Sequence, residues 1–513
     1  MKYQQGQDRE QLQIFPMSME AAISADNEVR MIELFVEGLD MEALGFKVDH
    51  IENGRPAYHP KDMLKLYLYG YMNRVRSSRE LEKETRRNIE VMWLLKGLSP
   101  DHNTISNFRR DNPNAIKKVF RATVALAKNF NLIGGHLLAG DSTKLRAQNS
   151  KKNNFNEKKI ERHLEYIGNK LSEYEKQLAE NDGDKEKEQQ ISQLIETQHH
   201  RKQTYENIQK QLVESGEVQV STSDPESRQM ITRNNITEVA YNVQTTVDSK
   251  NNIPIDYKVT NENDSKAMGG MLRRAKVIVG NNSFTALYDK GYHTGSEFAI
   301  AERLGIEVLV AVPGMPSSSN APNPAYNVAN FIYHADNDCY ICPQGQELRS
   351  NGTWYNREAA QFRQFKTPAC KSCPVRSECT TSVQNGKIVQ RSEYQHYIEQ
   401  NKERVAQNQN YYRRRQAIVE HPYGTIKRQW GFNYIMTKKT IKRASADVGL
   451  MFTAYNLRRI LNIIGKEAFT RFWLEFLVFL TSFLASLELF WQRQKNQLQN
   501  MFENSPSLQS ILC

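Results

Sequence analysis

Two short stretches decide the expected fold: Leu137-Leu138-Ala139-Gly140-Asp141-Ser142 and Ala286-Leu287-Tyr288-Asp289-Lys290-Gly291-Tyr292. Each is an apolar run of strand length that leads into an aspartate. In an open α/β sheet, side chains at the strand ends line the ligand site. The two aspartates are therefore candidates for one shared site.

Strand-like runs alternate with helical stretches around these aspartates. The expected strands cover residues 136–147, 238–247, 253–260, 284–288 and 307–312. The expected helices between them cover residues 265–279 and 295–304. Alternation of this kind predicts an α/β fold in which helices cover a sheet.

An insert between the first two expected strands has a pattern of its own. Its apolar side chains are spaced by four and three residues in turn, which is a heptad seam: Ile160, Leu164, Ile167, Leu171, Tyr174 and Leu178. A turn signal follows at residues 181–184, and a weaker seam returns through Ile191, Ile195, Tyr205 and Leu212. We therefore expect residues 150–216 to form a helical hairpin, which serves either as a dimerisation or DNA-clamping arm or as a passive spacer.

The segment before the sheet is basic and has helical periodicity. Residues 54–118 hold 14 lysines or arginines and 7 acidic residues, a net charge of +7. Helices are expected at 60–72, at 81–95 after the capping-box spacing of Ser77 to Glu80, and from Ser99 onward. This is typical of a helix-turn-helix unit whose last helix, with Arg109 and Arg110, binds DNA. The alternative is an ordinary helical domain with a solvated basic face.

The composition says more about the possible partners of the protein than about its fold. The chain has 513 residues, a net charge of +11 and a pI near 9.1. This length predicts about three domains, and the charge favours a polyanion or an anionic surface as partner. A hydrophobic content of 39% excludes disorder throughout the chain. Residues 1–9 are polar and do not resemble a secretory leader, so we expect a cytosolic protein.

One apolar stretch, residues 472–491, raises the question of a membrane span. Glu475 and Glu488 interrupt it and leave an uncharged run of residues 476–487. This run is shorter than the roughly 20 residues that a spanning helix needs. We expect residues 466–513 to form an apolar helix and tail that is buried or faces a partner.

A second basic segment surrounds a third candidate acid, Glu420. Residues 401–445 hold 11 lysines or arginines and two acidic residues, a net charge of +9. Together with Asp141 and Asp289, Glu420 would make an oxygen-only site suited to Mg²⁺ or Mn²⁺. Two such ions can activate a water or a 3′-hydroxyl for phosphoryl transfer. The alternative is that the three acids are unrelated solvated or salt-bridged carboxylates.

Three blocks of sequence resemble, in chain order, the signature blocks of bacterial insertion-sequence transposases of the DDE class. They are residues 140–142 (GDS), residues 288–292 (YDKGY) and residues 420–427 (EHPYGTIK). Residues 54–110 also resemble the N-terminal domain of such transposases, and residues 241–248 resemble their second strand.

The resemblance implies a ribonuclease H-like mixed sheet flanked by helices. It also implies Mg²⁺-dependent cleavage at transposon ends and joining of the freed 3′-hydroxyl to target DNA. Asp141, Asp289 and Glu420 would be the catalytic metal ligands, and Lys427 would assist them.

The third block departs from the family pattern at one position. Lys427 matches, but the arginine expected four residues before the glutamate is Gln416, and the nearest arginines are Arg413, Arg414 and Arg415. Pro422 argues against an unbroken helix through this block, because proline lacks an amide donor. Lys427 would then bind a DNA phosphate from a turn or from a second helical segment.

Five of the six cysteines lie in one segment without regular periodicity. Cys339 and Cys342 form one C-x-x-C pair, Cys370 and Cys373 form another, and Cys379 follows closely. In a reducing compartment, paired motifs of this kind resemble a zinc ribbon with four thiolate ligands. We predict a structural Zn²⁺ on the two pairs, with Cys379 as a possible substitute ligand. A redox dithiol or unligated cysteines are the alternatives.

The sequence thus predicts a DNA transposase in the bacterial cytosol, associated with the nucleoid and active as a homodimer. The predicted parts are a helical DNA-binding domain (1–125), a catalytic domain (136–465) with the hairpin (150–216) and a zinc-ribbon-like insert (313–395), and the apolar tail (466–513). Terminal-repeat and target DNA would be bound by basic side chains: Arg109, Arg110, Arg413, Arg414, Arg415 and Arg428. The alternative function is a catalytically inactive, domesticated DNA-binding protein.

Overall fold

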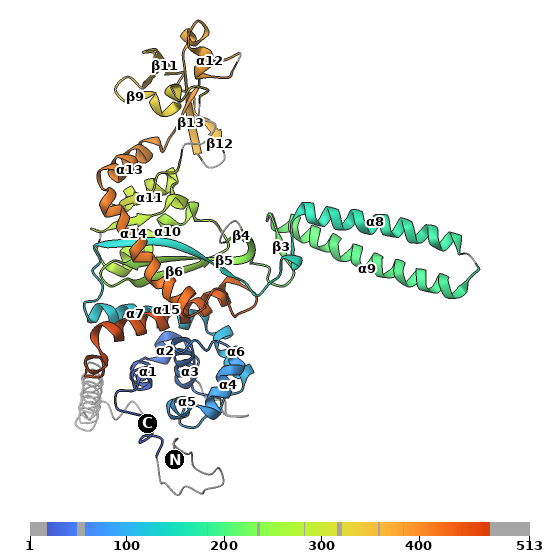
Figure 1. Ribbon diagram of the computed structural model, residues 1–513, viewed down its shortest axis with the longest axis vertical. Coiled ribbons are helices and arrows are strands. Elements are labelled where there is room, and N and C mark those ends of the chain that lie inside the picture. Colours follow the sequence, from blue (N-terminus) through green and yellow to red (C-terminus); the bar gives the residue numbers. More distant parts are fainter. Residues whose placement is uncertain are drawn as a thin grey trace, which may run out of the picture. The chain divides into compact units, whose positions relative to one another are not determined.

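The computed structural model describes residues 18–48, 57–181, 183–232, 236–281, 283–314, 321–357, 360–382 and 384–471 (Figure 1). These residues form two compact units. Unit 1 holds the chain up to Leu126, Trp430–Thr437 and the chain from Lys442 onward. Unit 2 holds Ala127–Gln429 and Lys438–Ile441.

A mixed sheet forms the centre of unit 2. Its strands, within the described residues, are β1 (Leu137–Arg146), β4 (Arg228–Ile231), β5 (Thr237–Asp248), β6 (Ile253–Thr260), β7 (Thr285–Tyr288) and β8 (Glu307–Val310). The order is β4-β5-β1-β7-β8, and β6 also pairs with β5. The strands β4, β6 and β1 run antiparallel to β5, whereas β1, β7 and β8 are parallel to one another.

The expected strands are confirmed to within two residues at each end. β4 was not predicted, because its sequence, Arg228-Gln229-Met230-Ile231, lacks the apolar run that marks the equally short β7 and β8. The expected helix at 265–279 begins with a 3-10 turn, η3 (Asp264–Lys266), and continues as α10 (Met268–Val279). α11 (Gly295–Leu304) has the predicted bounds.

The core of the sheet forms where β1, β5, β7 and β8 meet a C-terminal helix, α14 (Gln409–Tyr423). Ala139 of β1 and Leu287 of β7 pack there against Ile418 and Val419 of α14. Gly140 allows a close contact in the same region, because a Cβ at this position would lie 1.9 Å from Cε1 of Tyr288. The contact brings the residues before Asp141 and Asp289 together.

A side chain forms hydrogen bonds with the backbone at the end of the outer strand β8. Asn401, on α13 (Gln395–Gln407), is fully buried. Its amide nitrogen donates to the carbonyl of Val310 at 2.9 Å, and its amide oxygen accepts from the Val310 N–H at 2.9 Å. Both backbone groups at the end of β8 are therefore paired.

The predicted helical hairpin is confirmed as α8 (Glu157–Glu180) and α9 (Lys185–Ser215). Ile160 at the start of α8 packs with Ile208 and Leu212 near the end of α9, so the two helices are antiparallel. Short antiparallel strands, β2 (Asn154–Phe155) and β3 (Val220–Ser221), pair at the base of the hairpin.

The cysteine-rich insert contains a second, antiparallel sheet. Its strands in the described part of the chain are β9 (Ile332–His334), β10 (Cys339–Ile341), β11 (Glu347–Ser350), β12 (Tyr355–Arg357), β13 (Ala360–Lys366) and β14 (Val389–Ser392). The turn η8 (Pro368–Lys371) and helix α12 (Arg376–Cys379) follow β13. A small apolar cluster that includes Phe331, Tyr340 and Phe365 holds this insert together.

Unit 1 is helical, as predicted. Its helices in the described residues are α1 (Glu28–Glu37), α2 (Met41–Leu44), α3 (Pro60–Met72), α4 (Ser78–Arg87), α5 (Ile89–Leu94), α6 (His102–Asp111), most of α7 (Pro113–Asn129) and most of α15 (Ile441–Ile464).

The prediction of one helix over 81–95 was wrong. Asn88 is extended and breaks it into α4 and α5, because its side chain accepts from the N–H groups of Glu90 and Val91 and so starts a new helix. The predicted capping box is also not formed, since the Ser77 side chain makes no cap hydrogen bond. The start of the next predicted helix, α6, is capped by Asp101.

The helix α15 joins unit 1, although residues up to 465 were assigned to the catalytic domain by sequence. Its Asp447 is fully buried and accepts a hydrogen bond from the Tyr71 hydroxyl. The guanidinium groups of Arg76 and Arg109 lie 3.6 and 3.4 Å from its carboxylate. This buried polar cluster ties α15 to the N-terminal helices.

Among the residues that the structure describes, no helix is both long enough and apolar enough to cross a membrane. The apolar stretch 472–491 and the tail to residue 513 lie outside the described residues.

Candidate active site

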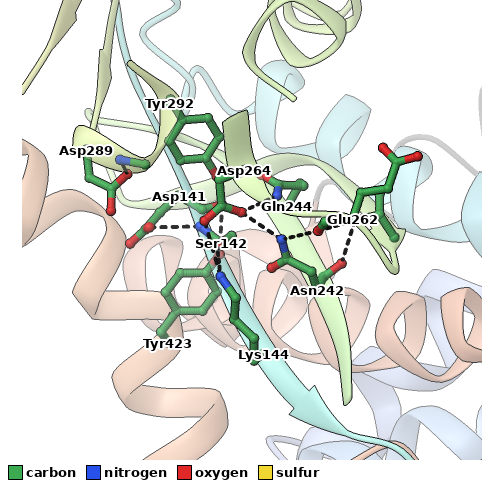
Figure 2. A network of polar contacts seen from close by, with 12 residues as sticks. Asp141, Ser142, Lys144, Asn242, Gln244, Glu262, Asp264, Asp289, Tyr292 and Tyr423 are labelled. Carbon is green, nitrogen blue, oxygen red and sulfur yellow. Dashed lines mark hydrogen bonds and ion pairs between the residues drawn. The ribbon is translucent and has the colours of Figure 1, made fainter. Parts of the chain in front are cut away.

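The two aspartates predicted from the strand ends lie close together (Figure 2). Asp141 lies in β1, and Asp289 directly follows β7, the parallel neighbour of β1. The Asp141 Oδ1 accepts from the Ser142 N–H at 2.8 Å. The Asp289 Oδ1 accepts from the Gly291 N–H at 2.9 Å and caps the turn η4 (Lys290–Tyr292). Each carboxylate is thus oriented by the backbone that follows it.

Burial dominates the electrostatics of Asp141. Burial, with smaller contributions from the nearby carboxylates of Asp289 and Asp264, raises the pKa of this carboxyl to about 6, against the opposing effects of Arg415 and the Ser142 N–H. Repulsion among close carboxylates is relieved by a cation. The carboxylates of Asp141, Asp289 and Asp264 therefore favour the binding of a cation between them.

The helix α14 supplies the opposite wall of this region. Its Arg415 has Nη1 3.5 Å from the Asp141 Oδ2. Its Tyr423 hydroxyl donates to the Asp141 carbonyl at 3.3 Å, and its Tyr412 hydroxyl donates to the Tyr288 carbonyl at 3.0 Å. α14 therefore contacts the strands of both aspartates.

Glu420 lies on α14 but is not shown in contact with either aspartate. Its side chain is exposed, and its Oε1 accepts from the Gln416 Nε2 at 2.8 Å. It lies one turn before Tyr423, on the flank of the buried face of the helix. Gln416, which replaces the expected arginine, thus orients the glutamate, and Arg415 supplies the cation near Asp141.

The expectation that no unbroken α-helix runs through this block is confirmed in part. Pro422 itself lies inside α14, but the α-helix ends at Tyr423 and the chain continues as a π-helical segment, η9 (Gly424–Gln429). The wider π turn follows directly on the proline, whose lost amide donor disturbs regular α-helical pairing. Lys427 in η9 is thereby turned to β1, where its Nζ donates to Thr143 Oγ1 at 2.8 Å and to the Lys144 carbonyl at 3.4 Å.

The arginines predicted to bind DNA have different environments. Arg109 is only 4% exposed and belongs to the Asp447 cluster, so the prediction that it binds DNA was wrong. Arg415 faces Asp141 and is 17% exposed, so it belongs to the site and not to an outer DNA-binding surface. Arg110 is exposed and pairs with Asp111 at 2.6 Å. The remaining three are exposed: Arg413, Arg414 and Arg428.

Sequence reasoning missed the polar network beside the aspartates (Figure 2). Its centre is Asp264, which accepts from Asn242 Nδ2 at 2.7 Å and from Gln244 Nε2 at 2.6 Å. Burial alone would raise the pKa of Asp264, but these amides and Lys144 lower it. The available signal was the pair Asn242 and Gln244, two amide side chains two residues apart and therefore on one face of the expected strand.

The cysteines do not group as predicted. Cys342, Cys370, Cys373 and Cys379 line one pocket. Cys339 is not among its lining residues and is 2% exposed within β10. Burial and a hydrogen bond with Glu347 raise the pKa of the Cys339 thiol, and burial also raises the pKa of the Cys379 thiol. The ligand set of Cys339, Cys342, Cys370 and Cys373 stays a prediction, and the pocket favours Cys379, the possible substitute, in place of Cys339.

Neither the carboxylates nor the thiols are drawn together as a bound metal would require. Within the described ranges, no group of three or more histidine, cysteine, aspartate or glutamate side chains is arranged to hold a metal ion. The donor types nevertheless suit different cations, since carboxylate oxygens suit Mg²⁺ or Mn²⁺ and thiolates suit Zn²⁺.

Comparison with known families identifies the kind of protein to which this site belongs. Residues 17–111 match a family model described as a transposase domain (DUF772), and residues 341–461 match one described as a transposase DDE domain. No curated protein and no solved structure matches the chain. The second match includes Glu420 and Lys427, whereas Asp141 and Asp289 lie outside both ranges.

The DDE match indicates a transposase enzyme of a family that acts on DNA and generally uses divalent metal ions. Together the two matches support an insertion-sequence transposase of the DDE class. Neither match supports the alternative of an inactive DNA-binding protein.

Proposed function

We propose that Asp141, Asp289 and Glu420 are the catalytic carboxylates of this transposase and that Lys427 assists them. The observation that carries the proposal is the placement of Asp141 and Asp289 on the parallel neighbours β1 and β7, with α14 against both strands. Glu420 lies on that helix, and Lys427 in η9 contacts β1 two residues beyond Asp141.

The proposed reaction is cleavage at transposon ends followed by transfer of the 3′-hydroxyl into target DNA. Bound Mg²⁺ or Mn²⁺, as two ions, would activate the attacking water or hydroxyl and stabilise the leaving oxygen. The carboxylates of Asp141, Asp289 and Glu420 would hold these ions. Arg415 would keep the Asp141 side chain oriented, and Lys427 would bind a DNA phosphate next to β1.

We also propose a ribonuclease H-like fold for the catalytic sheet. The strand order β6-β5-β1-β7-β8, with the first three strands antiparallel and the last three parallel, supports this assignment. We also propose the domain limits expected from the sequence, which are 1–125, 136–465, 150–216, 313–395 and 466–513. The exception is α15, which belongs to unit 1.

The remaining partners are proposed on chemical grounds. The substrate DNA would be double-stranded terminal repeats and target DNA, bound by exposed Arg110, Arg413, Arg414 and Arg428. An active homodimer would bring two transposon ends together. The bacterial cytosol, close to the nucleoid, would be the site of action.

Cleavage of labelled terminal-repeat DNA in Mg²⁺ tests the catalytic assignment. Asp141→Asn, Asp289→Asn and Glu420→Gln should each lower the cleavage rate by at least about 10³-fold, because each removes a proposed metal ligand. Asp256→Asn, at a buried aspartate of the same sheet, and Glu403→Gln, at an exposed glutamate of α13, are the matched controls.

Both control variants should retain cleavage within about threefold of the wild type. Asp141→Asn or Asp289→Asn protein that cuts as fast as the wild type would show that the catalytic assignment is wrong. A loss confined to the two aspartates, with Glu420→Gln fully active, would remove Glu420 from the site.

We further propose that structural Zn²⁺ binds Cys342, Cys370, Cys373 and Cys379. All four thiols are free, line one pocket and lie close enough that Cys370, Cys342 and Cys373 add to the burial that raises the Cys379 pKa. The Gln346 N–H lies 3.3 Å from the Cys342 sulfur, and such bonds to sulfur orient zinc ligands. With zinc bound to these four cysteines, the insert would resemble a zinc ribbon.

Metal analysis distinguishes this ligand set from the pair-based one. The purified protein should hold about one zinc per chain, Cys379→Ser should lose it, and Cys339→Ser should keep it. Zinc lost from Cys339→Ser but kept by Cys379→Ser would reverse the assignment.

A further inference from the structure

Asp264 lies beside the two aspartates but is engaged differently. It starts the turn η3 after strand β6, and its side chain is 16% exposed. Its Oδ1 accepts from two amides of β5, those of Asn242 and Gln244, and its Oδ2 lies 3.2 Å from the Lys144 Nζ of β1. Both oxygens therefore have partners within the protein.

The contacts of Asp264 continue to both sides of the candidate site. Lys144 is in β1, three residues beyond Asp141, and it also donates to Ser142 Oγ at 3.1 Å. On the other side, the Tyr292 hydroxyl donates to the Gln244 Oε1. Tyr292 closes the turn η4 that Asp289 caps. A continuous polar path thus links the strand of Asp141 to the turn of Asp289 (Figure 2).

The members of this path on β5 and in η4 are almost entirely removed from solvent. Asn242, Gln244 and Tyr292 are at most 1% exposed. Buried donors that lose their acceptor retain the full cost of desolvation. Asn242 keeps a second acceptor in the Glu262 carbonyl, at 2.9 Å, but the Gln244 Nε2 has Asp264 as its acceptor. Without Asp264, Gln244 would shift, and its hydrogen bond from Tyr292 would carry that shift to the η4 turn.

We propose that Asp264 is a positioning residue that sets the separation of Asp141 and Asp289 through Lys144 on one side and through Gln244 and Tyr292 on the other. The inference rests on the proposed catalytic role of the two aspartates. Asp264 is not itself a metal ligand in this scheme, because amide and ammonium donors already occupy its oxygens. Its effect reaches the metal only through the geometry of the two carboxylates.

Binding of Mn²⁺ to the full-length protein, followed by electron paramagnetic resonance, tests the proposal without DNA. Asp264→Asn replaces one acceptor oxygen by a donor that faces other donors, so it should weaken Mn²⁺ binding about tenfold. The matched control is Asp256→Asn, which removes a buried carboxylate of the same sheet paired with Arg274 at 2.5 Å. It should lower stability but leave Mn²⁺ affinity within twofold of the wild type.

Tyr292→Phe removes a single hydroxyl at the far end of the path and should weaken Mn²⁺ binding about threefold to fivefold. Because both changes break one path, the double variant with Asp264→Asn should bind no more weakly than Asp264→Asn alone. Should Asp264→Asn fail to fold, the Tyr292→Phe variant still decides the question, since it keeps the ring and its packing.

Two results would overturn the inference: wild-type Mn²⁺ affinity in both Asp264→Asn and Tyr292→Phe, or losses that add fully in the double variant. Failure of the underlying assignment looks different. It would appear as unchanged Mn²⁺ binding and unchanged cleavage in Asp141→Asn, whatever Asp264→Asn does.

Discussion

In unit 1, single charged residues join neighbouring helices through buried ion pairs that the sequence does not indicate. Lys65 is 1% exposed, although lysine is rarely buried, and its Nζ lies 2.6 Å from Glu33 and 2.7 Å from Glu37 of α1. Glu37 also pairs with Lys61 at 2.8 Å. These contacts join α1 to α3. The basic count of this segment predicted DNA contacts, and here part of that charge is neutralised inside the fold.

Glu37 gives this pairing a defined pH dependence. Burial alone would raise its pKa, but the hydrogen bonds from Lys61 and Lys65 outweigh burial and lower it to about 2. A folded-state pKa below the unfolded value of about 4.5 stabilises the protein above pH 4.5, and that stability is lost as the pH falls towards 2. Glu37→Gln should therefore lower the free energy of unfolding of unit 1 by about 1–2 kcal/mol at pH 7, after allowance for the partly exposed side chain.

Urea unfolding at pH 7 and at pH 2.5 measures this difference. The gap between wild type and Glu37→Gln should nearly close at the lower pH, where Glu37 is largely protonated in the unfolded state and partly so in the folded state. Glu42→Gln, at an exposed glutamate of α2, should change stability by less than about 0.5 kcal/mol at both values. A gap that is equally large at both values would show that the pairing contributes no such stability.

At the scale of elements, strands and helices with long apolar patterns could be predicted, whereas helix breaks and continuations that depend on single residues could not. The strand that contains Asp141 and the strand that ends before Asp289 followed from apolar runs, and the hairpin followed from its heptad seam. The break at Asn88 and the helix through Pro422 depend on single side-chain caps and on packing against the sheet. The Asn88 cap acts on residues two and three positions away and does not alter the apolar period, whereas the packing of α14 joins residues far apart in sequence, so the apolar pattern shows neither.

The hairpin makes a prediction at this scale. It leaves unit 2 through β2 and β3, where Phe155 pairs with Val220 across the ladder. Replacing residues 156–219 by a two-residue Asn-Gly turn should therefore close the ladder without disturbing the large sheet. Far-UV circular dichroism should lose the signal of α8 and α9, and cleavage should persist if the arm is a passive spacer.

The shortened protein also separates the alternatives for the arm. A change from dimer to monomer by light scattering would identify a dimerisation arm, and weaker DNA binding by an unchanged oligomer would identify a clamp. Aggregation of the shortened protein would contradict the structural premise that the ladder is self-contained.

At the scale of the whole molecule, the net charge of +11 is a poor guide to which side chains meet DNA. Arg109 and Lys65 are buried in ion pairs, and Arg415 faces an aspartate. Composition reports charge but not burial, which is why the sequence predicted the class of partner and misplaced part of the interface. Exposed cations, among them Arg110 and the arginines of α14 and η9, remain the proposed phosphate contacts.

Salt dependence checks this reassignment. Changing Arg413, Arg414 and Arg428 to Gln should weaken DNA binding at low salt and lower the slope of log K against log salt by up to about three. The control variant Arg109→Gln should leave that slope unchanged while it destabilises unit 1, because it leaves Asp447 buried with one partner fewer. A reduced slope in Arg109→Gln, with an unaltered slope in the triple variant, would restore the original assignment.

The amide of Asn401 has a consequence for self-association. A strand at the rim of a sheet normally offers its backbone groups to any other extended chain, which promotes aggregation and strand exchange. Asn401 engages both the N–H and the carbonyl of Val310 with one side chain. The Asn401 side chain thereby occupies the backbone groups of Val310 that an added strand would need, which disfavours strand addition at this end of β8.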